Sequence, residues 1–534
     1  MDPAEAPARL PQQSERPGAA VMRFVAPSVR DIIFIFLFWS LLAGTLSNRP
    51  LADPDIGWHI RTGELILQTH TIPRTDPFSA TMHGKLWFAW EWLYDLGLEV
   101  LYQSAGLNGV NWLCAVIVAS TFTLLLSQLI KRGSGILLAI VLMLLSECAS
   151  VIHLFARPHI VSWLLTLLWF VALERWRAGN SQQWLPWFFP VSMLFWVNLH
   201  GGWIVGLMLL TIYVLATSVE SWRAADEFAA VKTAHEARKM AGVWIVSALA
   251  TVVNPFGWRL YSHIYVYLGD RYLMNRIAEF QSPNFHFWPA RIFGVILVLT
   301  VIAWAGRSRG VPLTDVLVGL FAVYSGLFSS RNLPVSSMLL VLLIGPTLRR
   351  DLVLFTSNRG GWAWLRSRVE AVLEFSDRMS QQELRLRGHL WPFAVVVFGL
   401  VISMHGGALG GKQLVQAHFD PKQVPVAAVD FLEKEADSGP ILSTDSWGGY
   451  LIYRLYPRRQ VIMDDRHDLY GSERVRQFLV LMQGEPAWKE VLDNLQARTV
   501  LLPDNSTLAS LLRELPQEWQ VRHEDSVAIV FERR

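Results

Sequence analysis

Two aspartates, Asp53 and Asp55, flank a proline in the segment LADPDIGWH at 51–59. A proline disfavours helix at the residue before it, so we expect the preceding apolar helix to end here and both carboxylates to lie just beyond its end, at the membrane interface. A partly desolvated carboxylate has a raised pKa, which suits a general base. The alternative is that the motif only ends one helix and caps the next, which we expect at about 56–68.

Seven further polar residues stand at the ends of apolar runs or in the loops between them. They are His59, Arg157, His159, His200, Arg259, Arg331 and Asn332. Ionisable groups at membrane depth are costly, so they are candidates for function. The planar donor fork of arginine suits a phosphate, although arginines of this kind also contact lipid headgroups. We therefore predict a phosphate-binding rim that faces Asp53 and Asp55.

The composition shows which elements must position these residues. The chain has 534 residues, of which 52% are hydrophobic and only 17% are charged. A soluble surface needs roughly 25% charged residues, so a cytosolic enzyme and a disordered scaffold are excluded. The net charge of +3 is too small to imply nucleic acid, and two cysteines inside apolar runs exclude a disulfide framework and a thiolate zinc cluster. Most of this chain therefore lies in lipid.

Apolar runs of near-spanning length are separated by polar loops. We count eleven of them, at about 31–47, 108–130, 134–152, 159–174, 184–198, 202–219, 241–254, 290–306, 312–329, 333–348 and 391–410. They predict a mostly α-helical, polytopic bundle over 31–411. A flexible tail is expected at 1–30, rich in Pro, Ala and Arg.

The loop charges predict an orientation. Lysine and arginine fall in the even-numbered loops and in the N-terminal tail, and the loop at 349–390 is the richest. Because basic residues near span ends stay on the cytoplasmic side, the N-terminus and this basic segment are expected in the cytoplasm. With an odd number of spans, the C-terminal region at 412–534 is then extracytoplasmic.

The C-terminal region reads as a small α/β domain. We expect helices at 424–436, 472–482 and 505–515, and strands at 441–444, 460–464, 499–502 and 526–531. The polar turns 444–450 and 463–470 each follow an expected strand. Strand ends in α/β domains often bind ligands, but acid-rich turns are also ordinary loop chemistry.

The long first loop at 48–107 is expected to carry interfacial helices. Its segment 86–102 is aromatic on several sides and has Glu91, Asp95 and Glu99 at helical spacing. Three acids make an amphipathic helix lying at the interface a better fit than a span that tolerates them. The alternative remains an ordinary span.

This arrangement resembles the polytopic glycosyltransferases of the C superfamily (GT-C type), such as protein mannosyltransferases and aminoarabinose transferases. More closely, the chain is similar to an uncharacterised bacterial membrane-protein family that is grouped with these enzymes. The motifs that carry this resemblance are DPDIGWH, PRTDPFS, EWL, NLHGG, SSRNLP, WGGYLIY and DDRHDLYG. The resemblance implies a multi-pass protein of the bacterial inner membrane and the cell envelope.

The resemblance further implies inverting transfer of a sugar from a polyprenyl phosphate to a glycan, lipid or protein acceptor on the extracytoplasmic face. Asp53 or Asp55 would be the general base, and Arg157, His159 and Arg331 would supply charge to the leaving phosphate, with His59 and His200 as helpers. Some relatives also use a divalent metal ion beside the acidic pair. The Asp-Pro-Asp motif departs from the adjacent acids of several relatives, and the oligosaccharyltransferase pentapeptide is missing. The substrates of that subgroup are therefore not implied.

A second hypothesis comes from a different class of protein. The chain could be a non-catalytic membrane assembly or binding protein that uses its outer C-terminal region. In that case the acidic loop would tolerate substitution. The enzyme hypothesis predicts the opposite.

Overall fold

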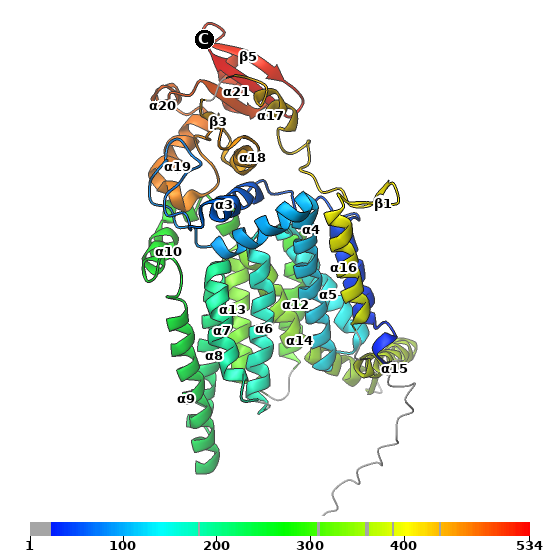
Figure 1. The fold of residues 1–534 in the computed structure, drawn as a ribbon. Helices are drawn as coiled ribbons and strands as arrows, with labels where there is room; N and C mark the ends of the chain where they lie inside the picture. The colour runs from blue at the N-terminus through cyan, green and yellow to red at the C-terminus, as the bar shows by residue number, and fades with distance from the viewer. Residues whose placement is uncertain (1–22, 180–181, 307–309, 358–361, 387–388, 437–438) are drawn as a thin grey trace, which may run out of the picture.

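The computed structural model describes residues 23–179, 182–306, 310–357, 362–386, 389–436 and 439–534. Within these residues a bundle of long helices carries a small sheet region at one end (Figure 1). Most of the tail expected at 1–30 lies outside the described residues. Most of the cytoplasmic segment expected at 349–390 is helical.

The bundle consists of twelve described helices. These are α2 (Val29–Leu42), α4 (Trp92–Lys131), α5 (Ile136–Ser150), α6 (His159–Arg177), α7 (Leu185–Leu199), α8 (Trp203–Trp222), α9 (Glu227–Ala250), α12 (Trp288–Ala305), α13 (Leu313–Phe328), α14 (Leu333–Ser357), α15 (Ala363–Arg385) and α16 (Leu390–Met404). Each of the eleven expected apolar runs overlaps one of them. Among the described residues, five helices are long and apolar enough to span a membrane, or six if the bent pair α15 and α16 forms one span. Others are too short or carry charged ends, so eleven spans are not confirmed.

The loops predicted to be basic meet at the end of the bundle opposite the sheet region (Figure 1). Arg132 Nη2 lies 2.6 Å from a carboxylate oxygen of Glu174, and Arg177 Nη1 lies 3.0 Å from Asp315 Oδ1. These ion pairs join the end of α4 to the last turns of α6, and the end of α6 to the first turn of α13. The alternation of loops between two ends of the bundle is therefore present, while the side of the membrane that each end faces stays a prediction.

The first long loop differs in part from its prediction. Helix α3 (Ile56–Thr69) confirms the helix expected at 56–68. The helix expected at 86–102 begins only at Trp92, as α4, and continues through a kink at Gly106 into the bundle. Its acids do not face solvent, because Asp95 and Glu99 are 1% and 3% exposed and pack against α3.

The C-terminal region contains a four-stranded sheet of order β3-β4-β6-β5. Its strands are β3 (Ile441–Ser443), β4 (Thr499–Pro503), β5 (Trp519–Glu524) and β6 (Ala528–Arg533), of which only β3 and β4 are parallel. The strands expected at 441–444, 499–502 and 526–531 are confirmed. The one expected at 460–464 is wrong, since Val461 forms only isolated bridges to Ser79 and Ile441.

The remaining elements connect or cover these parts. A short hairpin of β1 (Ala408–Leu409) and β2 (Lys412–Gln413) follows the bundle, and helices α17 (Val426–Leu432), α18 (Asp445–Leu455), α19 (His467–Gln483), α20 (Trp488–Asn494) and α21 (Thr507–Arg513) surround the sheet. Helices α10 (Arg259–Gly269) and α11 (Arg271–Met274) and the short turn η2 (Ala278–Phe280) lie between α9 and α12. Two further turns, η1 (Val151–His153) and η3 (Ser330–Asn332), lie before α6 and before α14. The three predicted C-terminal helices correspond to α17, α19 and α21.

Helices α3 and α18 approach each other closely through glycine. A Cβ atom on Gly57 would lie 2.2 Å from the carbonyl oxygen of Gly449, and one on Gly449 would lie 2.5 Å from the carbonyl oxygen of Pro54. Both distances are shorter than van der Waals contact, so any side chain at either position would push the helices apart. The acidic loop is therefore held directly against the C-terminal region.

Candidate functional site

The two aspartates of the first loop lie beside one arginine. Arg157, in the turn before α6, places Nη1 2.7 Å from Asp53 Oδ2 and 3.4 Å from Asp55 Oδ2. Asp53 Oδ1 also accepts the backbone N–H of Asp55, at 3.0 Å. Asp55 stands at the N-cap position of α3, but its side chain makes no capping bond. The capping alternative therefore does not explain the Asp55 carboxyl.

The third acid of this cluster comes from the C-terminal region. The side chains of Asp55 and Asp465 are hydrogen-bonded to each other, although 410 positions separate them. Burial, assisted by the charges of Asp465 and Asp53, raises the pKa of Asp55 well above its usual value. Burial also raises the pKa of Asp465 to about 7, although its hydrogen bond to Asp55 acts in the opposite direction. Two carboxyls in this contact share one proton, so one carboxylate of the pair can accept another.

A second polar group lies next to the first. Arg331, in η3, has Nη1 3.5 Å from Glu279 Oε2 and Nη2 3.3 Å from His200 Nε2. Glu279 also faces Arg157, whose Nη1 lies 3.5 Å from its Oε1. Burial acts to raise the pKa of Glu279, but the two arginines outweigh it and lower this pKa to about 2. Glu279 is therefore a fixed negative charge that orients both arginines.

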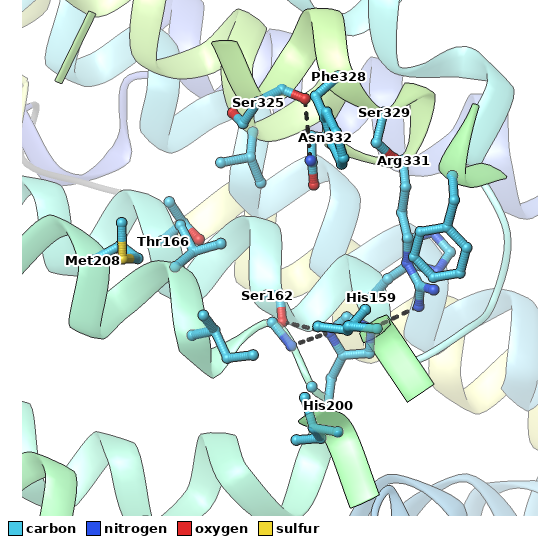
Figure 2. Close-up of a pocket in the computed structure, with 18 of the residues that line it drawn as sticks. His159, Ser162, Thr166, His200, Met208, Ser325, Phe328, Ser329, Arg331 and Asn332 are labelled. Carbon is cyan, nitrogen blue, oxygen red and sulfur yellow. Dashed lines mark hydrogen bonds between the residues drawn. The ribbon is translucent and has the colours of Figure 1, made fainter. Parts of the chain in front are cut away.

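Two cavities meet at this polar group. The large cavity, of about 590 Å³, runs between α6, α8, α10 and α13, and is mostly apolar with His159, His200, Arg331 and Asn332 in its wall (Figure 2). The small cavity, of about 90 Å³, is lined by the acids Asp55, Asp465 and Asp468, by Arg157 and by aromatic side chains. Residues shared by both walls are Trp90, Glu91, Tyr267 and Arg331. A ligand with an apolar tail and a polar head could occupy both cavities at once.

The structure places some of the predicted site residues in the walls of the two cavities and others outside them. Asp55 and Arg157 line the small cavity, while His159, His200, Arg331 and Asn332 line the large one. Arg157 is already paired with carboxylates, so it is less free to bind a phosphate than Arg331. His59 is fully buried beneath the site, with Nδ1 2.6 Å from Asp95 Oδ1. Arg259 is exposed at the start of α10 and lines neither cavity.

Sequence reasoning missed three residues of the site. Glu91 was placed on an amphipathic helix and Asp465 in a strand-end turn, and Glu279 lies in a loop between two expected spans. Each belongs to a segment that stood out for its charge, such as DDRHD at 464–468, but no local pattern shows which acid faces the first loop. Only the tertiary fold brings them together.

One group of described residues has the donor atoms for a metal ion. One ligand atom each of Asp445, Asp465 and His467 lies within 4.8 Å of the others. Carboxylate and imidazole donors suit divalent ions such as Mn²⁺ or Zn²⁺. These three side chains could therefore hold a divalent ion at the edge of the acid cluster.

The fold is similar to that of a solved oligosaccharyltransferase. The archaeal oligosaccharyltransferase AglB from Archaeoglobus fulgidus, in complex with an inhibitory peptide and a dolichol-phosphate, aligns over 89% of this chain and 69% of its own, with a TM-score of 0.50 and 10% identity. Its form tethered to an acceptor peptide containing the NVT sequon covers 89% and 68%, with a TM-score of 0.51 and 11% identity. The apo form covers 89% and 69%, also at a TM-score of 0.51 and 11% identity. No protein-family model and no curated protein matches the sequence.

The described helices include several that are long and apolar enough to span a membrane, and their fold is similar to that of this oligosaccharyltransferase. This similarity supports the resemblance to the GT-C type glycosyltransferases that the arrangement of the sequence predicted. At 10–11% identity, the similarity shows the fold alone.

Proposed function

We propose that this protein is an integral-membrane glycosyltransferase that moves a sugar from a polyprenyl phosphate to an acceptor hydroxyl, with inversion. The observation that supports it most is the buried carboxyl of Asp55, which makes no capping bond to α3 and lines the small cavity. The small cavity joins the large apolar cavity at Arg331. This arrangement matches a donor with an apolar chain, a phosphate and a sugar in that order. The acceptor is a glycan, a lipid or a protein.

In this proposal the prenyl chain occupies the large cavity and the phosphate lies against Arg331 and His200. Arg331 is the cation at the junction, and its planar fork can donate two hydrogen bonds to phosphate oxygens. The sugar then extends into the small cavity, towards Asp55. Aromatic side chains there, among them Trp58 and Trp87, offer apolar surface to the sugar ring.

Asp55 is the better general base of the two aspartates. Asp53 Oδ2 accepts a hydrogen bond from Arg157, and Asp53 Oδ1 accepts one from the backbone N–H of Asp55, so both of its oxygens are already engaged. Asp55 lies on the cavity and shares a proton with Asp465, so the pair has one basic oxygen to offer. As the acceptor oxygen attacks the anomeric carbon, its proton passes to this carboxylate. The bond between the anomeric carbon and the phosphate oxygen breaks, and its electron pair leaves with the lipid phosphate.

The Arg331→Ala variant tests the donor site. A charge-assisted hydrogen bond contributes about 1.5–3 kcal/mol, so we expect the KM for the polyprenyl-phosphate sugar to rise about 10- to 100-fold. The measurement is transfer of radiolabelled sugar by purified protein in detergent. Arg259→Ala, an exposed arginine outside both cavities, should behave as wild type. An unchanged KM in Arg331→Ala would exclude the proposed phosphate position.

We also infer that the end of the bundle that carries the sheet region faces outward from a bacterial inner membrane. The support is the basic loops at the opposite end, which are expected to stay in the cytoplasm. A reporter fused after Arg534 that is active only outside the cytoplasm should therefore be active. If only a cytoplasmic reporter is active at this position, the site lies inside and a nucleotide sugar becomes the better donor.

A further inference from the structure

Helix α15 lies at the end of the bundle opposite the sheet region (Figure 1). The apolar helix α16 follows it in the chain, and the directions of the two helices differ by 70°. Among its 23 residues α15 carries four arginines and four acids, unlike the apolar helices of the bundle. Its charges and its direction therefore call for a role other than crossing the membrane.

One face of α15 is fixed to the bundle by polar contacts. The Ser380 hydroxyl accepts the backbone N–H of Ile136 at 2.9 Å. The Ser376 hydroxyl accepts that of the next residue, Leu137, at 3.3 Å. Both N–H groups belong to the first turn of α5, where a helix provides no acceptor of its own. The buried Glu383 pairs with an arginine at the start of α2. Because this face is held, the other faces of α15 have fixed directions.

A second face of α15 is apolar but exposed. Trp364, Val372 and Phe375 are between 47% and 66% exposed. With Arg368 and Met379 they follow one another at intervals of three or four residues, so the five side chains form one stripe along the helix. We call these five residues the α15 stripe. Contiguous exposed apolar side chains of this kind mark an interaction surface.

The remaining charges of α15 are sorted around the helix. At 3.6 residues per turn, Arg378 and Arg385 border the α15 stripe on the side away from the fixed face. The three acids outside the fixed face lie still farther from the stripe: Glu370, Glu374 and Asp377. An interfacial helix has this order, because apolar side chains reach the acyl chains, arginines reach the headgroups and acids stay in water.

The neighbouring helix ends and the charges identify the occupant of this surface. Leu354, near the end of α14, and Phe393, near the start of α16, are exposed and apolar, so the chain enters and leaves α15 at surfaces that suit lipid. Tryptophan is enriched at the membrane interface, where Trp364 would lie. The planar fork of arginine matches a lipid phosphate, and basic side chains near a membrane attract anionic headgroups.

We propose that α15 is an interfacial helix that binds anionic phospholipid headgroups at this end of the bundle. The α15 stripe inserts among the outer carbons of the acyl chains, and Arg368, Arg378 and Arg385 contact headgroup phosphates. Because α15 also caps α5, lipid bound here stabilises the bundle. The proposal concerns the end of the protein remote from the two cavities and does not depend on the proposed function.

The first test measures how anionic lipid stabilises the full chain. Thermal unfolding in dodecyl maltoside micelles is followed as phosphatidylglycerol or the zwitterionic phosphatidylcholine is added. We expect a higher melting temperature with phosphatidylglycerol only, and a smaller shift at high salt. Each arginine near an anionic surface contributes about 5-fold in affinity, so combining Arg368→Gln with Arg378→Gln should raise the half-saturating fraction of phosphatidylglycerol about 25-fold. Arg474→Gln, an exposed arginine of α19 at the other end, is the matched control.

The second test locates the α15 stripe relative to the bilayer. A nitroxide label is attached to Val372→Cys in the full chain, with Cys114→Ala and Cys148→Ala, in vesicles of phosphatidylglycerol and phosphatidylcholine. Oxygen, which concentrates in the acyl region, should relax this label more than a water-soluble nickel chelate does. A label on Glu374→Cys, on the side of α15 that faces water, should show the reverse order.

The outcomes decide between lipid and other occupants of the surface. Equal stabilisation by both lipids, or an unchanged half-saturating fraction in the double arginine variant, would overturn headgroup binding. A label at position 372 that the nickel chelate reaches as readily as one at position 374 would place the α15 stripe in water. A label at position 372 that neither reagent reaches would show that protein covers the stripe, either a second copy or another segment of this chain. Each of the last two results would overturn the insertion of the stripe into lipid.

Discussion

Replacing Asp55 with asparagine is expected to reduce sugar transfer by about 10²- to 10⁴-fold, the usual contribution of a general base. Asparagine keeps the size of the side chain but cannot accept the proton of an acceptor hydroxyl. The substitution also removes one acid from a buried pair, so the protein should remain as stable as wild type in detergent. Transfer from a polyprenyl-phosphate sugar and the melting temperature of the same preparation provide the two measurements.

Two further aspartates serve as controls for this variant. Asp53→Asn breaks the near contact with Arg157 and should lower activity less than Asp55→Asn does. Asp377→Asn, at the other end of the bundle, should have no effect on transfer. Normal transfer by both Asp55→Asn and Asp53→Asn would contradict the catalytic proposal and favour a non-catalytic assembly or binding protein.

Replacing Arg466 with methionine is expected to destabilise the folded protein by about 3–5 kcal/mol, the cost of breaking a buried ion pair. Arg466 is 4% exposed, and its guanidinium contacts Asp76 Oδ1 at 2.8 Å and Asp464 Oδ2 at 2.7 Å. It also lies over the ring of Trp87, at 4.6 Å from the centroid. Methionine fills much of the space but leaves two carboxylates buried without their cation. Chemical unfolding in detergent measures the loss.

The ion pair between Arg466 and Asp464 also makes the stability of the folded protein depend on pH. Burial acts to raise the pKa of Asp464, but Arg466 outweighs it and lowers this pKa. The contribution of the pair is then fully present above the unfolded-state pKa of about 3.9 and is lost as the pH falls through the lower folded-state value.

The control for this variant is an arginine at the surface. Arg513→Met, which breaks exposed pairs with Asp504 and Glu524, should cost at most about 1 kcal/mol of folding free energy. A loss of the same small size in Arg466→Met would show that Arg466 does not hold the first loop to the C-terminal region.

The helices and most strands could be predicted because their signal is local. Each apolar run lies on a helix, and the runs around Leu442, Val500 and Val530 are strands, since continuous hydrophobicity is a property of neighbouring residues. Helix α18 was missed because Gly448 and Gly449 read as a turn, whereas they are needed for close packing against other backbone. The number of spans stays a prediction, because apolar composition alone does not measure how far a helix extends.

The candidate site was predictable only in part. The polar residues in loops between apolar runs include Asp55, His200 and Arg331, which line the two cavities. The sequence could not show that Arg157 is neutralised by acids or that Asp465 reaches Asp55, because both depend on contacts between distant segments. Burial, which sets the state of an acid such as Glu91, is likewise a property of the fold.

The close approach of Gly57 and Gly449 has a consequence for anyone who wishes to re-engineer this protein. Because the C-terminal region completes the acid cluster, it cannot be exchanged independently of the helical bundle. A chimera that imports this portion from a relative would need to import the matching stretch around 53–57 with it. The two stretches form one functional unit that the chain happens to encode at opposite ends.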